Sequence, residues 1–291
     1  MRVLYYSKGG QAELPRTEAI SEHGRISLSS NPTSHRTATL KPKPSFMSPS
    51  LAPTYSQAPH EIKFLLPRPL ATHVRAWARE FMHADANAVA ALDHAYQVQS
   101  LYLDTANFDV FHRRGSYGRG KYRIRQYLPA GIVFLERKLK TKGTVRKRRT
   151  PTELLELQQL AGITPSSWPG YWYHRRLLVR RLQPVCQISY LRHAFMTISE
   201  GSAIRLTLDE RIGASRTSQY HFQNTSEVIN LLDDKTILEL KFAGESPALF
   251  KRLIDEFGIT AEAVSKYRLA LPALGVIQAA EPSANAPALI G

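Results

Sequence analysis

The sequence predicts an α+β domain, a closed or nearly closed antiparallel β-barrel of about eight strands with flanking helices and a polar interior. Apolar and polar residues alternate along several segments, and few helical segments separate them. Between His112 and Arg149, fourteen Lys or Arg stand against a single acid, Glu136. Because successive strand side chains face opposite sides, this alternation gives the sheet one apolar and one cationic face.

The folded domain is predicted to span 60–271. Residues 1–59 contain seven Pro and ten Ser without a periodic apolar pattern, and we expect them to be disordered. The tail 272–291 is rich in Ala and Pro and is expected to be flexible.

The first predicted element is the strand HEIKFLL, which is stopped by Pro67 and Pro69. Leu70, Val74 and Trp77 lie at helical spacing, which predicts an amphipathic helix over 70–83. The remaining strands are expected near 96–103, 119–128, 131–141, 143–149, 184–197, 203–212 and 235–243, and helices near 152–161, 170–182 and 247–257. The segment 170–182 also allows an irregular conformation.

The net charge is +15, and residues 60–271 hold +12 of it, from 32 Lys or Arg and 20 acids. The charge therefore belongs to the folded domain and indicates a polyanionic partner. The single cysteine, Cys186, excludes a disulfide framework and is expected to be a buried structural thiol. We predict a cytoplasmic protein, because no segment has the pattern of a signal peptide or a membrane span.

Every charged strand contributes to one face. The first strand carries Glu61 and Lys63, and the strand ILELKF carries Glu239 and Lys241. The hairpin RKRR contributes Lys147 and Arg149, or Arg146 and Arg148 if its parity is reversed. The other members of this face are Arg123, Arg125, Glu136, Lys138, Tyr190, Arg192, Arg205, Thr207 and Asp209.

These residue types suit a phosphate chain and a metal. Arg makes bidentate bonds to phosphate oxygens, and Lys acts as a mobile point charge. The carboxylates of Glu61, Glu136 and Glu239 offer hard oxygen ligands to Mg²⁺ or Mn²⁺. Glu136 is equally able to pair with Arg123 or Arg125, and Asp209 is expected to pair with a cation rather than bind metal.

Nine segments occur in an order that makes the chain resemble a known family. They are EIKFLL, SLYLDT with NFDVFHRRG, KYRIRQY, VFLERKLK, VRKRRTP, PVCQISYLRHAF, IRLTLDERI, ILELKF and VSKYRLAL. Over roughly residues 60–269 the chain resembles the vacuolar transporter chaperone (VTC) domain. That domain belongs to the triphosphate tunnel metalloenzymes, together with the CYTH phosphatases. Each segment alone is weak evidence for this resemblance, but the occurrence of all nine in the same order is specific to the family.

The resemblance implies an eight-stranded antiparallel tunnel that uses ATP, pyrophosphate and inorganic polyphosphate. The VTC branch transfers the γ-phosphoryl group of ATP onto a growing polyphosphate chain, with Mn²⁺ or Mg²⁺. Glu239 would bind the metal, and Lys266 of SKY would close one end of the tunnel. The phosphates would be held by Lys63, Arg123, Arg125, Lys138, Lys147, Arg192 and Arg205, with Tyr190, Arg149 and Lys241 nearby.

The chain departs from the wider superfamily in its first strand. The pattern ExExK is reduced here to Glu61 and Lys63, with Pro59 at the first Glu position, which favours the VTC branch and leaves the number of metals open. Yeast relatives add an SPX domain and membrane helices, which the resemblance does not cover. We therefore allow for a separate membrane or regulatory partner.

Three other functions are open. A barrel that binds RNA or single-stranded DNA would combine cations with stacking aromatics and avoid carboxylates, so we expect no nucleic-acid partner. A module that binds polyphosphate without turnover is the stronger rival, and a CYTH-type triphosphate hydrolase is the third. No obvious pair of His and carboxylate is available to activate water, which weakly favours transfer.

Overall fold

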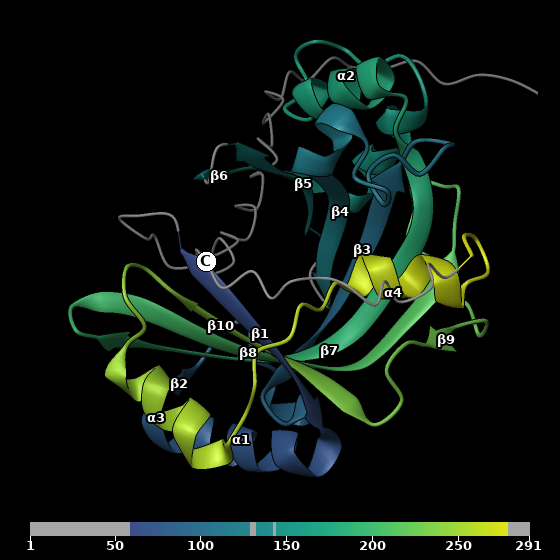
Figure 1. The fold of residues 1–291 in the computed structure, drawn as a ribbon. Coiled ribbons are helices and arrows are strands. Elements are labelled where there is room, and N and C mark those ends of the chain that lie inside the picture. Colours follow the sequence, from purple (N-terminus) through teal and green to yellow (C-terminus); the bar gives the residue numbers. More distant parts are fainter. Residues whose placement is uncertain (1–58, 129–131, 142–143, 279–291) are drawn as a thin grey trace, which may run out of the picture. The chain divides into compact units, whose positions relative to one another are not determined.

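The computed structural model describes residues 59–128, 132–141 and 144–278. Eight strands form one sheet in the order β1-β10-β8-β7-β3-β4-β5-β6, and every neighbouring pair is antiparallel (Figure 1). This confirms the predicted α+β class and its antiparallel sheet. The bounds are β1 His60–Pro67, β3 Ala95–Asp104, β4 Gly120–Leu128, β5 Ile132–Thr141, β6 Thr144–Glu153, β7 Gln183–Ser199, β8 Ser202–Arg216 and β10 Lys235–Phe242.

The remaining elements are short or helical. Strands β2 (His83–Ala84) and β9 (Ile229–Asn230) pair with β7 and β8. The helices are α1 Arg68–Phe81, α2 Tyr171–Arg180, α3 Ala248–Phe257 and α4 Lys266–Ala273, and 3-10 turns cover Ala90–Leu92, Gly115–Arg119 and Leu154–Ala161. Helix α4 extends two residues past the predicted boundary at 271. The expected disorder at 1–58 and the tail from 279 fall outside the described residues.

The two end strands of the sheet are not hydrogen-bonded to each other in the part of the chain that the structure describes. The predicted barrel is therefore seen as an open, strongly curved sheet (Figure 1). Strand β6 has four consecutive cations, at 146–149. Such charge is typical of edge strands that stay unpaired, which gives a physical reason for the open edge.

Helices α1 and α3 cover one apolar part of the sheet. In α1, Val74 and Trp77 are buried, as their helical spacing predicted, and Pro67 directly precedes the helix. Phe250 and Leu253 of α3 join the same core, together with apolar residues of β1, β8 and β10. The polar side chains of β1, β8 and β10 lie on the opposite face of the sheet.

Of the two conformations allowed for the segment 170–182, the structure shows the helix, α2. This helix covers the apolar face of strands β4 to β6. The ring of Tyr173 in α2 lies 6.1 Å from the ring of Tyr122 in β4. Val133 and Leu135 of β5 are fully buried on this face, as the alternation predicted. The segment predicted as a helix over 152–161 forms 3-10 turns from 154.

Cys186 lies buried on β7, and burial raises the pKa of its thiol. The predicted burial of this thiol is therefore confirmed. None of the helices within the described ranges has both the length and the apolar character needed to cross a bilayer.

Candidate phosphate-binding site

The register of β4, β5 and β6 resolves the parity of the charged hairpin. Arg123 pairs with Glu136, which pairs with Arg149, and Lys138 pairs with Lys147 in the next row. Lys147 and Arg149 therefore share the face of Glu136. Arg148 lies on the other face, with its guanidinium 4.0 Å from the ring centre of Trp172.

Glu136 is the centre of the first cation cluster. Its carboxylate lies 2.6 Å from Arg123 Nε and 3.3 Å from both Lys147 Nζ and Arg149 Nε. Burial raises the pKa of this carboxyl group, but the surrounding cations, Arg123 first, hold it far below its usual value. Glu136 is thus committed to cations, which favours the ion-pair alternative over a metal role.

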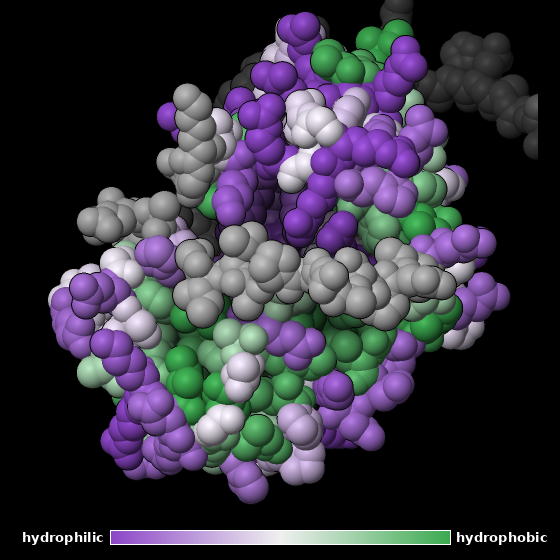
Figure 2. Space-filling model, viewed as in Figure 1, coloured by the Kyte–Doolittle hydropathy of each residue, from purple (hydrophilic) through white to green (hydrophobic). Residues whose placement is uncertain are grey.

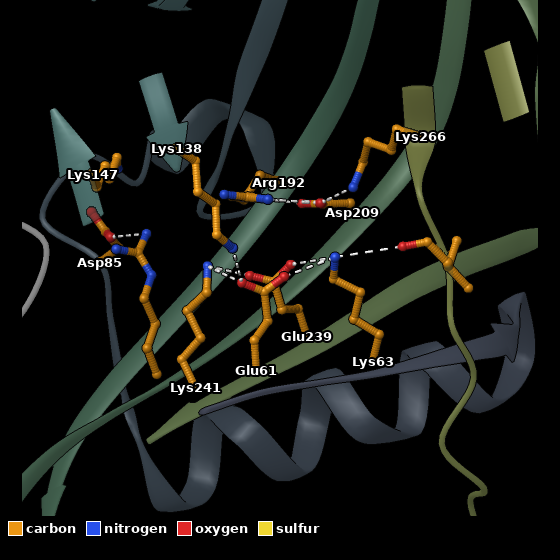
Figure 3. Close-up of polar contacts among 12 residues, drawn as sticks. Glu61, Lys63, Asp85, Lys138, Lys147, Arg192, Asp209, Glu239, Lys241 and Lys266 are labelled. Atoms are coloured by element: carbon orange, nitrogen blue, oxygen red, sulfur yellow. Dashed lines mark hydrogen bonds and ion pairs between the residues drawn. The ribbon is translucent and has the colours of Figure 1, made fainter. Parts of the chain in front are cut away.

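A second cluster joins β1, β5 and β10 (Figure 3). Lys63 Nζ lies 2.8 Å from Glu61 and 3.6 Å from Glu239, and Lys138 Nζ of β5 lies 3.3 Å from Glu61. Lys241 contacts both carboxylates. Burial raises the pKa of Glu239, but Lys241 and Lys63 hold it well below its usual range. The same lysines lower the pKa of Glu61 against the effect of burial, so both carboxylates are anionic.

Asp209 forms a third cluster with Arg192 and Lys266. The guanidinium of Arg192 makes two hydrogen bonds to the carboxylate, of 2.6 and 2.7 Å, and Lys266 Nζ donates one of 2.6 Å. Asp209 is fully buried, and burial raises its pKa less than these two cations lower it. This is the pairing with a cation that the sequence favoured for Asp209, and Figure 3 shows both cations beside it.

Arg125 differs from the other arginines of this face. It is 4% exposed, and its Nε donates a hydrogen bond of 3.0 Å to Ser100 Oγ. Among the described residues, no carboxylate lies within 4.0 Å of it. Its guanidinium lies 5.9 Å from the ring centre of Tyr190, which Arg192 and Lys266 also approach, at 5.2 and 4.7 Å.

Glu61 and Glu239, the other two carboxylates predicted as metal ligands, are paired with Lys63, Lys138 and Lys241, so a divalent metal would have to displace these ammonium groups. Neighbouring carboxylates that face a phosphate-binding surface are the usual protein ligands of Mg²⁺, which keeps its other positions for water and phosphate. Thr207, directly opposite Glu239 on β8, has a buried hydroxyl oxygen without a hydrogen-bond partner among the described residues. The described residues hold no group of three or more His, Cys, Asp or Glu placed as metal ligands, so a phosphate ligand would have to complete this site.

Sequence reasoning missed several residues that support this face. Asp85 binds Arg205, and Tyr102 stacks on Tyr267 with ring centres 5.2 Å apart. Asp104 accepts a hydrogen bond of 2.6 Å from the Tyr267 hydroxyl. The partners of each pair lie far apart in the sequence, so no local pattern could have revealed them.

All the cations and carboxylates predicted for this face lie on the same side of the sheet. Figure 2 shows hydrophilic side chains around a hollow between the part formed by β4–β6 and the part formed by β1 and β10. Cations that outnumber the carboxylates on one face are typical of proteins that bind a compact, highly charged anion.

The chain was also compared with protein families by sequence. The VTC domain family matches residues 58–274, so the chain belongs to the VTC domain family and the predicted resemblance is confirmed. The comparison with curated proteins found no match.

Among solved structures, a candidate adenylate cyclase from Bacillus halodurans is 13% identical, with a TM-score of 0.44 over 72% of this chain and 94% of that one. A candidate adenylyl cyclase from Hippeastrum, described as having a dominant triphosphatase activity, is 18% identical, with a TM-score of 0.41 over 71% and 92% of the two chains. A third candidate adenylate cyclase, from Vibrio parahaemolyticus, is 13% identical, with a TM-score of 0.42 over 73% and 97%.

Proposed function

We propose that this protein is a metal-dependent polyphosphate polymerase that transfers the γ-phosphoryl group of ATP onto an inorganic polyphosphate chain. The observation that carries the proposal is Arg125, a buried cation with no carboxylate within 4.0 Å among the described residues. Glu136, the nearby carboxylate that acts on Arg125, already pairs with Arg123, Lys147 and Arg149. Positive charge around Arg125 therefore exceeds negative charge, which favours an anionic ligand. Membership of the VTC domain family supports a phosphate chain as that ligand.

The charged face would close around the chain as a tunnel. The ion pair of 3.3 Å between Lys138 and Glu61 links β1, at one end of the strand order, to β5, the strand next to the other end. A polyanion bound between these ends would neutralise cations on both sides and draw them together. In this proposal the open sheet becomes the predicted eight-stranded tunnel only when the phosphate chain is bound.

Chain transfer needs little from the protein beyond charge and geometry. The terminal oxygen of a phosphate chain is already anionic near neutral pH, so no general base is required. Arg123, Arg125 and Arg192 would suppress the repulsion between two polyanions and hold the reacting groups in line. A divalent ion held by Glu61 and Glu239 would supply further neutralisation of the charge that develops during transfer.

Replacing Glu239 with glutamine is expected to abolish metal-dependent turnover while leaving the binding of tripolyphosphate within about twofold of wild type. The reason is that the substitution removes a hard anionic metal ligand but keeps the shape of the side chain and leaves the arginines in place. Glu245→Gln, at an exposed position, is the matched control. Steady-state rates across a Mn²⁺ titration test this expectation, and normal activity of Glu239→Gln would overturn the metal assignment.

The affinity for tripolyphosphate is expected to fall as the pH rises above about 8, because Tyr127 then ionises inside the face. Burial raises the pKa of this phenol, but the guanidinium groups, Arg125 first, lower it overall to about 8. A phosphate ligand favours the neutral phenol, so affinity is constant below this pKa and declines above it.

Tyr127→Phe should remove this pH dependence. Tyr220→Phe is the control and should keep it, because burial raises the pKa of Tyr220. Calorimetric titrations of tripolyphosphate between about pH 7 and 9 test the point. An unchanged decline in Tyr127→Phe would mean that another group is responsible.

A further inference from the structure

Asp85 is a buried acid that the charge pattern of the strands does not predict. It follows β2, and its backbone N–H donates a hydrogen bond of 2.8 Å to the carbonyl of Ala194 on β7. One carboxylate oxygen, Oδ1, accepts hydrogen bonds from the backbone and side-chain nitrogens of Asn87, at 2.9 and 2.6 Å. These contacts fix the plane of the carboxylate and leave Oδ2 for another partner.

That partner is Arg205 on β8. Asp85 Oδ2 lies 2.7 Å from Arg205 Nη2, and the same nitrogen donates a hydrogen bond of 3.1 Å to the hydroxyl of Tyr96. The two acceptors hold one nitrogen of the guanidinium. No bond from Nε or Nη1 to another described residue is present, so these donors are free for a ligand.

The strand register places Arg205 on the charged face. Arg205 pairs with Lys241 of β10, which pairs with Glu61 of β1. Its side chain is 14% exposed, and that of Asp85 is 2% exposed. Asp85 therefore binds the arginine from a buried position, and Figure 3 shows Asp85 away from the cluster of Glu61 and Glu239.

We propose that Asp85 is a positioning residue of the phosphate site, which holds the guanidinium of Arg205 in the orientation that binds a phosphate group. A free arginine loses rotamer freedom when it binds, whereas one already held in place loses less. The inference deepens the proposed function and rests on it.

A double-mutant cycle with Arg205→Met tests the inference. Asp85→Asn alone is expected to weaken tripolyphosphate binding roughly three- to tenfold, because the neutral amide no longer holds the arginine by an ion pair. In the Arg205→Met background the same change should have no further effect on affinity. The readout is calorimetric titration of the full chain with tripolyphosphate at fixed salt.

A merely structural role gives a different pattern. If Asp85 only stabilises the fold, Asp85→Asn should lower the melting temperature and weaken binding by the same factor in both backgrounds, and this result would overturn the inference. Asp93→Asn is the matched control, because Asp93 pairs with Arg75 and Arg79 and its side chain is 56% exposed. It should leave the affinity unchanged.

Asn87→Ala provides a second, milder variant in case Asp85→Asn does not fold. It loosens the carboxylate without altering any charge, and its loss of affinity should also vanish in the Arg205→Met background. Equal losses in both backgrounds would again contradict the inference. If wild-type protein fails to bind tripolyphosphate, the proposed function fails; if wild type binds but the cycle is additive, only the role of Asp85 fails.

Discussion

Replacing Arg125 with methionine is expected to weaken tripolyphosphate binding and, in the absence of ligand, to leave the free energy of unfolding within about 1 kcal/mol of wild type. The affinity should fall by roughly 10- to 100-fold, the equivalent of about 1.5–3 kcal/mol for hydrogen bonds to a charged group. Stability should change little because methionine avoids the desolvation of a buried charge but also loses the attraction of Arg125 to Glu136 and its hydrogen bond to Ser100. Calorimetric titration and chemical denaturation measure the two effects.

Two control variants sharpen this expectation. Arg123→Met should lower stability, because it removes the partner that lies 2.6 Å from the buried carboxylate of Glu136. Arg176→Met, at an exposed position on α2, should change neither quantity. Loss of stability without loss of affinity in Arg125→Met would mean that Arg125 is a structural residue and not a phosphate ligand.

Replacing Asp104 with alanine is expected to lower the free energy of unfolding by about 3–5 kcal/mol. Its buried carboxylate accepts hydrogen bonds from the backbone nitrogens of Thr105, Val110 and Phe111, at 2.7, 2.8 and 2.9 Å. It also accepts one of 2.6 Å from the hydroxyl of Tyr267 in α4. Alanine would leave all of these donors without an acceptor.

Chemical denaturation measures this loss, with Asp255→Ala on the exposed side of α3 as the control, expected within about 0.5 kcal/mol of wild type. The substitution should also loosen the contact of Lys266 with Asp209, because Lys266 precedes Tyr267 in the chain. A fall in stability below about 1 kcal/mol would show that water replaces the carboxylate at low cost.

The alternation of charged and apolar residues was enough to predict the strands and the side that each of them presents. Lys121, Arg123 and Arg125 share one face of β4, as their spacing required, and Tyr122 packs against α2 on the other. The hairpin strand β6 was ambiguous, because four consecutive cations satisfy either parity. Only its pairing with β5, where Glu136 lies opposite Arg149, decides between them.

The supporting contacts could not be predicted because they depend on tertiary structure. Asp104 and Tyr267 are 163 positions apart, and Tyr96 and Arg205 are 109 apart. Asp85 lies in a loop without periodic pattern, so nothing in the sequence distinguishes it from an exposed acid. Closure of the barrel is equally beyond local patterns, since it depends on whether a cationic edge strand finds a partner.

The most direct test of the proposed function is product analysis of the purified protein with γ-labelled ATP, Mn²⁺ and a trace of pyrophosphate. The products are separated on a gel that resolves phosphate chains by length. A ladder of long labelled chains, with release of ADP, is the result expected of a polyphosphate polymerase. Labelled free phosphate alone would identify a triphosphatase, and tight chain binding without turnover would identify a binding module; either result would contradict the proposal.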